Sequence, residues 1–136
     1  MSRNRGFTLI ELMIAVAIIA IIAAIAFPSY LKSAQKGRRS DAKSALTQAT
    51  QALERCYTQY GTYNSGNCAE VTTLTSGTTS QQGYYTISFA AASTDDTATT
   101  FKVSATAINS GPQAKDTGCT LMTLDNQGNQ GPSGCW

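Results

Sequence analysis

A single carboxylate, Glu11, stands in an otherwise uncharged stretch of 21 residues that runs from Phe7 to Phe27. As a helix this stretch would measure roughly 30 Å, which is enough to cross the apolar part of a bilayer. An ionised carboxylate there costs on the order of 3 kcal/mol or more without a partner. We therefore expect a cationic partner for Glu11, and we expect function to depend on it. The simpler alternative is a charge near the membrane surface, where a side chain reaches the headgroups at lower cost.

The residues before this stretch indicate how it is processed and oriented. Arg3 and Arg5 form a short basic head, and the small residue Gly6 stands just before Phe7. A secretory signal peptide also begins this way, but here the apolar run is too long and no A-x-A cleavage site follows it. Cleavage after Gly6 would remove the two charges and keep the helix. The basic head predicts that this end stays in the cytoplasm and that the rest of the chain is exported.

The chain has four cysteines and no histidine. An even number of cysteines in a small exported domain favours two disulfides, and three pairings are possible. We expect the local pairing, Cys56–Cys68 and Cys119–Cys135, because it closes the shortest loops; each bridge would contribute roughly 3 kcal/mol. A zinc site is the alternative, but no CxxC spacing is present. We find no nucleophile–base pair, metal constellation or phosphate-binding glycine loop, so we expect neither enzymatic activity nor a metal or cofactor.

Apolar periodicity predicts one long helix from about residue 7 to residue 57, bent at Pro28. Its inner half, 7–29, is apolar on every side. Its outer half, 30–57, is amphipathic, with an apolar stripe at three- and four-residue steps. The stripe consists of Ala42, Ala45, Leu46, Ala49, Leu53, Cys56 and Tyr57.

The remaining residues, 58–136, indicate a small antiparallel sheet. Residues 58–83 are polar and are predicted as a loop. Three segments alternate apolar and polar residues and are predicted as strands: 85–91, 101–107 and 120–124. Residues 92–100 would connect the first two strands, and the tail would be held only by Cys135. The predicted fold class is α+β, with the amphipathic half-helix packed on a sheet of three to four strands.

Five basic residues follow the apolar run on the helix: Lys32, Lys36, Arg38, Arg39 and Lys43. They form a band that would face solvent or lipid headgroups, or a stripe that would contact DNA phosphates. Residues 58–136 hold two lysines and five carboxylates, a net charge of −3 that opposes DNA binding. Arg38 could also pair with Asp41, three residues further along the helix.

The residues from Gly6 to Pro28 resemble the start of a type IV pilin of the type IVa class. The resemblance implies that a prepilin peptidase cuts after Gly6 and that the new terminus, Phe7, is N-methylated. It places the glutamate of the family at Glu11 and its helix-bending proline at Pro28. In the implied assembly, Glu11 of one subunit recognises the Phe7 amine of another. Ala20 departs from the glycine that many members carry, a change that favours helix by about 1 kcal/mol.

The rest of the chain resembles the smaller pilins, a group that includes minor pilins and ComP-like DNA-uptake receptors. The resemblance rests on residues 83–89 and 101–107 and on the run from Cys119 to Cys135-Trp136. It implies the pilin fold, with a disulfide-bounded C-terminal loop, and a structural subunit of a type IV pilus, most like a minor pilin, that serves adhesion, twitching motility or DNA uptake. The alternatives are a pilus-borne DNA receptor, a major pilin and a pseudopilin of type II secretion.

This resemblance also implies a domain organisation and a set of partners. Residues 1–6 would be a leader, 7–29 the transmembrane and filament-core helix, 30–57 its amphipathic half, and 58–136 the αβ-loop, sheet and C-terminal loop. The partners would be other pilin subunits, the prepilin peptidase, an inner-membrane assembly platform and the membrane itself, with DNA as a further candidate. The subunit would lie in the bacterial inner membrane with its C-terminal domain in the periplasm, and later in the extracellular pilus.

Overall fold

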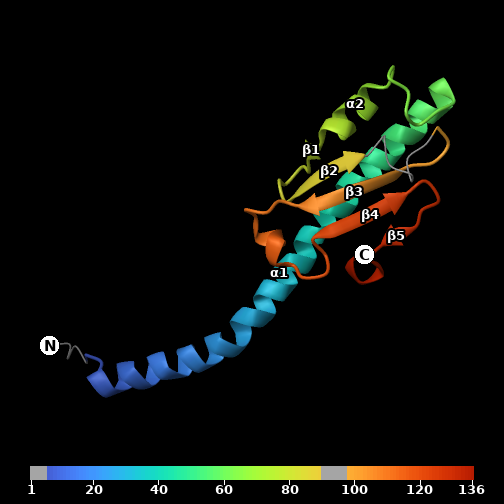
Figure 1. Cartoon of the computed structure of the whole chain (residues 1–136). Coiled ribbons are helices and arrows are strands. Elements are labelled where there is room, and N and C mark those ends of the chain that lie inside the picture. The colour runs from blue at the N-terminus through green and yellow to red at the C-terminus, as the bar shows by residue number, and fades with distance from the viewer. Residues whose placement is uncertain (1–5, 90–97) are drawn as a thin grey trace. The chain divides into compact units, whose positions relative to one another are not determined.

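The computed structural model of the chain describes residues 6–89 and 98–136. Two compact units are present, one ending at Ala34 and the other beginning at Gln35. The elements occur in the following order (Figure 1): α1 (Leu9–Tyr60), α2 (Ala69–Ser76), β1 (Thr78–Thr79), β2 (Tyr85–Phe89), β3 (Lys102–Ala107), η1 (Pro112–Lys115), β4 (Leu121–Asp125), β5 (Gln130–Gly131) and η2 (Ser133–Cys135).

The first unit consists of the apolar part of α1. The helix contains an 18-residue window with a mean hydropathy of 2.9, and none of that window is buried. It continues through Pro28 without interruption. An apolar helix with every face exposed must be covered by something outside this chain, either lipid or other proteins.

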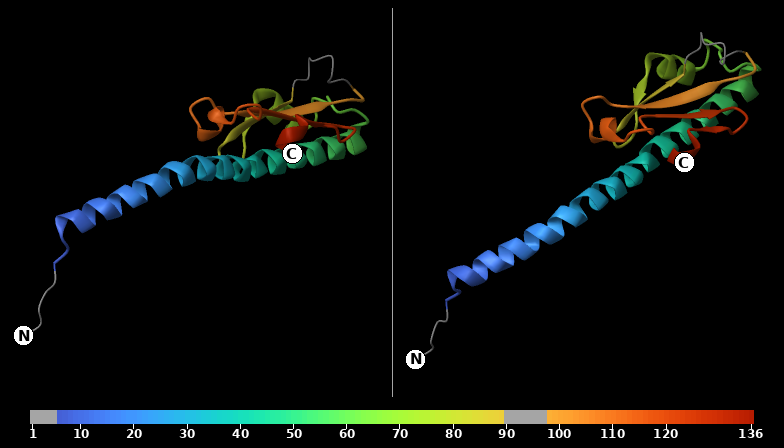
Figure 2. Two further views of the ribbon diagram at one scale, coloured as in Figure 1. Left: turned by 90° about the horizontal axis from the view of Figure 1, so that it is seen from below. Right: turned by 60° about the horizontal axis from the view of Figure 1, so that its bottom comes forward.

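The second unit is built around the amphipathic part of α1. Five apolar positions of the predicted stripe are buried: Ala42, Leu46, Ala49, Leu53 and Cys56. Both views in Figure 2 show the sheet lying along this part of the helix. Tyr57, which was predicted in the stripe, is instead 37% exposed. Asp41 is buried although it is charged, so it must be satisfied by hydrogen bonds.

The sheet is antiparallel, with the strand order β1-β2-β3-β4-β5. The three predicted strands are present as β2, β3 and β4. Buried and more exposed side chains alternate along these strands. The buried residues Ile87, Ala105 and Met122 lie opposite one another on neighbouring strands. The prediction of three to four strands was wrong, because β1 and β5 add two strands of two residues each. A two-residue strand is too short to show alternation. The tail is therefore held by pairing with β4 as well as by Cys135.

The segment predicted as a loop, 58–83, also contains regular structure. The helix α1 continues to Tyr60, and α2 and β1 follow. Threonines occupy three of the eight positions of α2 and have a low helix propensity. Val71 and Leu74, three residues apart, bury one face of α2 in the core. The predicted connection at 92–100 falls mostly on residues 90–97, which lie outside the described residues.

Both cysteine pairs are local, as predicted. Cys56 is bonded to Cys68, with 6.1 Å between their Cα atoms, and Cys119 is bonded to Cys135, with 5.6 Å. The first bridge joins the last turns of α1 to the residue before α2. The second joins the residues before β4 to η2 at the C-terminus.

Candidate assembly site and the basic residues of α1

Thr8 and Glu11 form a capping box at the start of α1. The backbone N–H and the hydroxyl of Thr8 donate to Oε2 of Glu11 at 2.9 and 2.8 Å, and the N–H of Glu11 donates to Oγ1 of Thr8 at 3.3 Å. These bonds satisfy backbone donors that have no partner within a helix. The spacing Thr8-Leu9-Ile10-Glu11 is the usual sequence signature of this cap, so the cap can be predicted from the sequence.

The capping box uses only one oxygen of the Glu11 carboxylate. Oε1 forms no hydrogen bond with any residue in the described ranges. Phe7, which would become the new N-terminus, is 91% exposed. Glu11 therefore has an oxygen open to a donor from another molecule while its own helix end stays capped.

Arg39 does not belong to a surface stripe, because it is bonded to Asp116. Its Nε and Nη2 donate to the two carboxylate oxygens at 2.7 and 2.8 Å, and its Nη1 donates to the carbonyl of Gly134 at 3.3 Å. The hydrogen bond to Asp116 raises the pKa of the guanidinium, against the effect of burial. Bidentate pairs of this kind fix geometry, so Arg39 ties α1 to η1 and the C-terminal loop.

Gln113 extends this network into the core. Its side-chain amide lies within hydrogen-bond distance of the Gln35 carbonyl at 3.3 Å, the Tyr85 hydroxyl at 2.9 Å and an Asp116 oxygen at 3.2 Å. Burial raises the pKa of Tyr85, although the hydrogen bond from Gln113 opposes the shift. The segment η1 is thus attached by polar contacts to the first turns of α1 in the second unit.

Arg38 and Asp41 do not pair with each other, so that prediction was wrong. The guanidinium of Arg38 lies 5.4 Å from the centre of the Tyr84 ring, a cation–π contact. The Asp41 carboxylate accepts hydrogen bonds from the Ser80 hydroxyl and from the backbone N–H groups of Gln82 and Tyr84. Asp41 therefore holds the β1–β2 turn against the helix.

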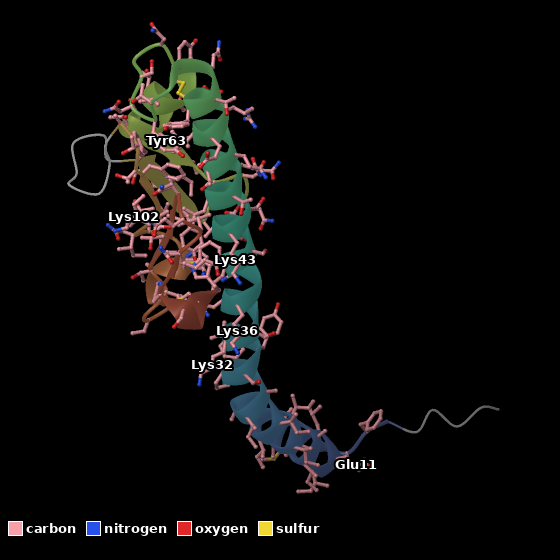
Figure 3. The ribbon with its side chains drawn as sticks, turned by 90° about the vertical axis from the view of Figure 1, so that its right-hand side faces the viewer. Glu11, Lys32, Lys36, Lys43, Tyr63 and Lys102 are labelled. Carbon is pink, nitrogen blue, oxygen red and sulfur yellow. A yellow bond between two sulfur atoms is a disulfide. The ribbon has the colours of Figure 1, made fainter. Side chains whose placement is uncertain are left out.

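The lysines of the predicted basic cluster remain available for contacts. In the second unit Lys36 is exposed and Lys43 is half-buried, and in the first unit Lys32 is exposed (Figure 3). Lys102 on β3 lies opposite Asp125 on β4. Burial acts to raise the pKa of Asp125, but hydrogen bonds from Asn129 and Gln127 and the charge of Lys102 lower it overall. The structure thus divides the cluster into Arg38 and Arg39, which contact Tyr84 and Asp116, and lysines that form no ion pair in the described residues.

The described residues contain no group of three or more His, Cys, Asp or Glu side chains arranged to hold a metal ion.

The two parts of the chain match known families. Residues 1–27 match the prokaryotic N-terminal methylation motif, and residues 28–123 match the family described as "Type IV minor pilin ComP, DNA uptake sequence receptor". The chain belongs to this family of type IV minor pilins.

A solved structure agrees with this membership. The pilin resembles a type IV pilin from Shewanella oneidensis with 28% sequence identity and a TM-score of 0.50, over 75% of this chain and 97% of that one. No curated protein matches the chain. The resemblance of Gly6–Pro28 to the start of a type IV pilin is confirmed, and so is that of the rest of the chain to minor pilins. A methylation motif followed by an apolar helix fits a pilin that is anchored in a membrane before it joins other pilin subunits in a pilus.

Proposed function

We propose that this minor pilin is stored in the inner membrane through Phe7–Phe27, with its C-terminal unit in the periplasm, and enters the pilus when that helix exchanges lipid for the helices of other subunits. The observation that carries the proposal is the exposure of the apolar part of α1 on all faces. Lipid and a bundle of apolar helices are equivalent covers for such a surface, so the same helix serves both states. The prepilin peptidase and an inner-membrane assembly platform are the partners that this route requires.

In the proposed assembly, Oε1 of Glu11 receives the Phe7 amine of a neighbouring subunit. Cleavage after Gly6 would create this amine one residue before Thr8. Unlike charges attract strongly in a bundle of low dielectric constant, and a subunit out of register would leave one charge buried without a partner. The free Oε1 supports the proposal, because the neighbour can bind without displacing the capping box.

The proposed pairing is best tested with Glu11→Gln and Glu11→Ala side by side. Glutamine can keep the capping box, since Gln also serves at this position, but it removes the charge. Both variants should insert into the membrane and fail to be incorporated into sheared pili, as measured by immunoblot against the membrane fraction. Incorporation of Glu11→Gln at the wild-type level would show that the charge is not what the neighbour recognises.

The proposed processing has a separate readout. Intact-mass analysis of the mature pilin should show the loss of residues 1–6 and the addition of one methyl group at Phe7. A chain that retains Gly6 in assembled pili would contradict the proposed cleavage. This measurement does not depend on the role of Glu11.

A second candidate function is that of a DNA receptor on the pilus. It is favoured by the description of the family that residues 28–123 match. Lys36 and Lys43 are lysines of the predicted cluster in the second unit that can meet phosphates, whereas Arg39 is occupied by Asp116. Asp116, one of the five carboxylates of residues 58–136, is buried and paired with Arg39, so it adds little to the negative charge that DNA phosphates would meet.

DNA binding can be tested by gel shift with the intact pilin in detergent micelles over a range of salt concentrations. Lys36→Gln and Lys43→Gln should each weaken binding and reduce the slope of log K against log[salt] by about one. Lys115→Gln is the matched control, because it removes an exposed cation from η1 instead of α1. Absence of binding at low salt, or equal effects of all three variants, would exclude this DNA surface.

A further inference from the structure

A groove of about 550 Å³ lies in the second unit between α1, α2 and β1. Ala49, Leu74 and Ile87 contribute a buried apolar floor. Polar side chains stand around this floor, among them Gln48 and Gln81. A volume of this size with an apolar floor and a few polar groups is typical of a binding site.

The dimensions of the groove fit an extended chain. Along α1 its lining residues extend from Ala45 to Arg55, ten residues further on, which corresponds to about 15 Å of helix. Dividing the volume by this length gives a mean cross-section of about 37 Å², which corresponds to a width of about 6 Å. Neighbouring β-strands lie about 4.8 Å apart in the hydrogen-bonding direction, so the backbone of an extended chain fits this width. The groove accommodates four to five residues of an extended chain.

One wall of the groove offers unused backbone groups. The strand β1 is the end strand of the sheet. The N–H of Ser80 donates to the carbonyl of Tyr85 at 2.8 Å, and Thr79 pairs with Thr86 in the next position. Because hydrogen-bonded pairs alternate in an antiparallel ladder, the N–H and C=O of Thr79 point away from β2. Neither group has a partner elsewhere in the described residues, so both can bind an added strand.

Two unpaired charges mark the far end of the groove. Arg55 on α1 and Glu70 on α2 line opposite walls and are exposed, close to the Cys56–Cys68 bridge. Neither forms an ion pair with another residue of the described ranges. Successive side chains of an extended peptide point to opposite sides. Adjacent acidic and basic residues would therefore meet Arg55 and Glu70 at the same time.

We propose that this groove binds an extended peptide segment of a partner protein, which adds beside Thr79 and places neighbouring acidic and basic side chains against Arg55 and Glu70. The segment is held by two main-chain hydrogen bonds at one end and by two ion pairs at the other. This site is independent of the Glu11 assembly site and of DNA binding.

The test uses a fluorescein-labelled peptide, Ala-Thr-Ala-Thr-Asp-Lys-amide, and the intact pilin in detergent micelles at low salt, with fluorescence anisotropy as the readout. Binding should be saturable, and a peptide with two alanines in place of Asp-Lys should bind about tenfold more weakly. Thr79→Pro should also weaken binding about tenfold, because proline has no N–H. Thr79→Val is the matched control that keeps the N–H and the branched shape.

Charge reversal separates specific recognition from general attraction. The double variant Arg55→Glu/Glu70→Arg should prefer the peptide that ends in Lys-Asp over the one that ends in Asp-Lys, reversing the preference of the wild type. Circular dichroism should show that all variants keep the fold, since the changed groups are exposed. Equal binding by Thr79→Pro and Thr79→Val, no reversal of preference, or no saturable binding below about 1 mM would each overturn the proposal.

Discussion

The ion pair between Arg39 and Asp116 should be worth more to the fold than any other contact of the basic residues of α1. Arg39→Met keeps an apolar stem of similar length and removes both hydrogen bonds to the carboxylate, at 2.7 and 2.8 Å. Asp116→Asn keeps the shape and removes the negative charge. The two substitutions therefore break the same pair from opposite sides.

The expected magnitudes differ because the two side chains are buried to different extents. The side chain of Asp116 is 4% exposed and that of Arg39 is 15% exposed. In Arg39→Met the carboxylate stays buried, with the amide of Gln113 as its one remaining side-chain donor in the described residues. Loss of one member of a buried pair costs about 3–5 kcal/mol, and the partial exposure of this pair places the cost near 3 kcal/mol. In Asp116→Asn the guanidinium can reach water, so we expect about half as much.

Thermal unfolding of the fragment Tyr30–Trp136, followed by circular dichroism with the disulfides intact, measures both costs. The fragment contains every residue of the core. For a domain of about 100 residues, these costs correspond to a fall in Tm of about 15 °C for Arg39→Met and about 7 °C for Asp116→Asn. Lys36→Met is the control and should change Tm by less than about 2 °C, because Lys36 is exposed. The reasoning fails if Asp116→Asn is the more costly change, or if Arg39→Met behaves like the control.

Three further predictions concern single contacts of the second unit. Burial, and then the hydrogen bond to Glu54, raise the pKa of Tyr63 from 10.0 to about 12. The contribution of Tyr63 to the free energy of unfolding should therefore be complete below pH 10 and fall by up to about 3 kcal/mol between pH 10 and 12. Unfolding followed by spectroscopy at each pH should show this loss for the wild type and not for Tyr63→Phe. Gly131→Ala would place its Cβ 2.8 Å from Oγ1 of Thr123, and a denaturant titration should show a loss of about 1–2 kcal/mol of stability. The same loss in a chain that also carries Thr123→Ala would contradict this clash. Asp41→Ala leaves three donors without their acceptor and should cost about 2–3 kcal/mol, with Asp41→Asn at about half; a neutral effect on Tm would show that water replaces the carboxylate.

The main elements of the fold could be predicted because their signals are local. Period-two alternation gave β2, β3 and β4, and the apolar stripe gave the buried face of α1. The helix α2 lacked such a signal, since its threonines disfavour helix and only Val71 and Leu74 mark its buried face. The strands β1 and β5 are two residues long and exist because a neighbouring strand supplies their hydrogen bonds, which depends on tertiary structure.

The candidate sites show the same division between local and long-range information. Glu11 stood out because it is a charge in an apolar stretch, and its bond to Thr8 spans only three residues. The partner of Arg39 lies 77 residues away in the sequence, and no periodicity links the two positions. Cation clusters on a helix can therefore be found in a sequence, but which cations face outward depends on contacts with distant segments.

The capping box limits what the charge of Glu11 can contribute to the proposed assembly. Two donors from Thr8 already stabilise the carboxylate within the single chain, and this stabilisation lowers the cost of holding a charge in the membrane. A contact that is equally present in the stored and assembled states does not change the balance between them. The difference must come from what Oε1 binds after assembly, and in the proposed pairing that is a cationic amine on a neighbour. Glu11→Gln should therefore leave the stored state almost unchanged and weaken the assembled state, whereas loss of the cap through Thr8→Ala should weaken both.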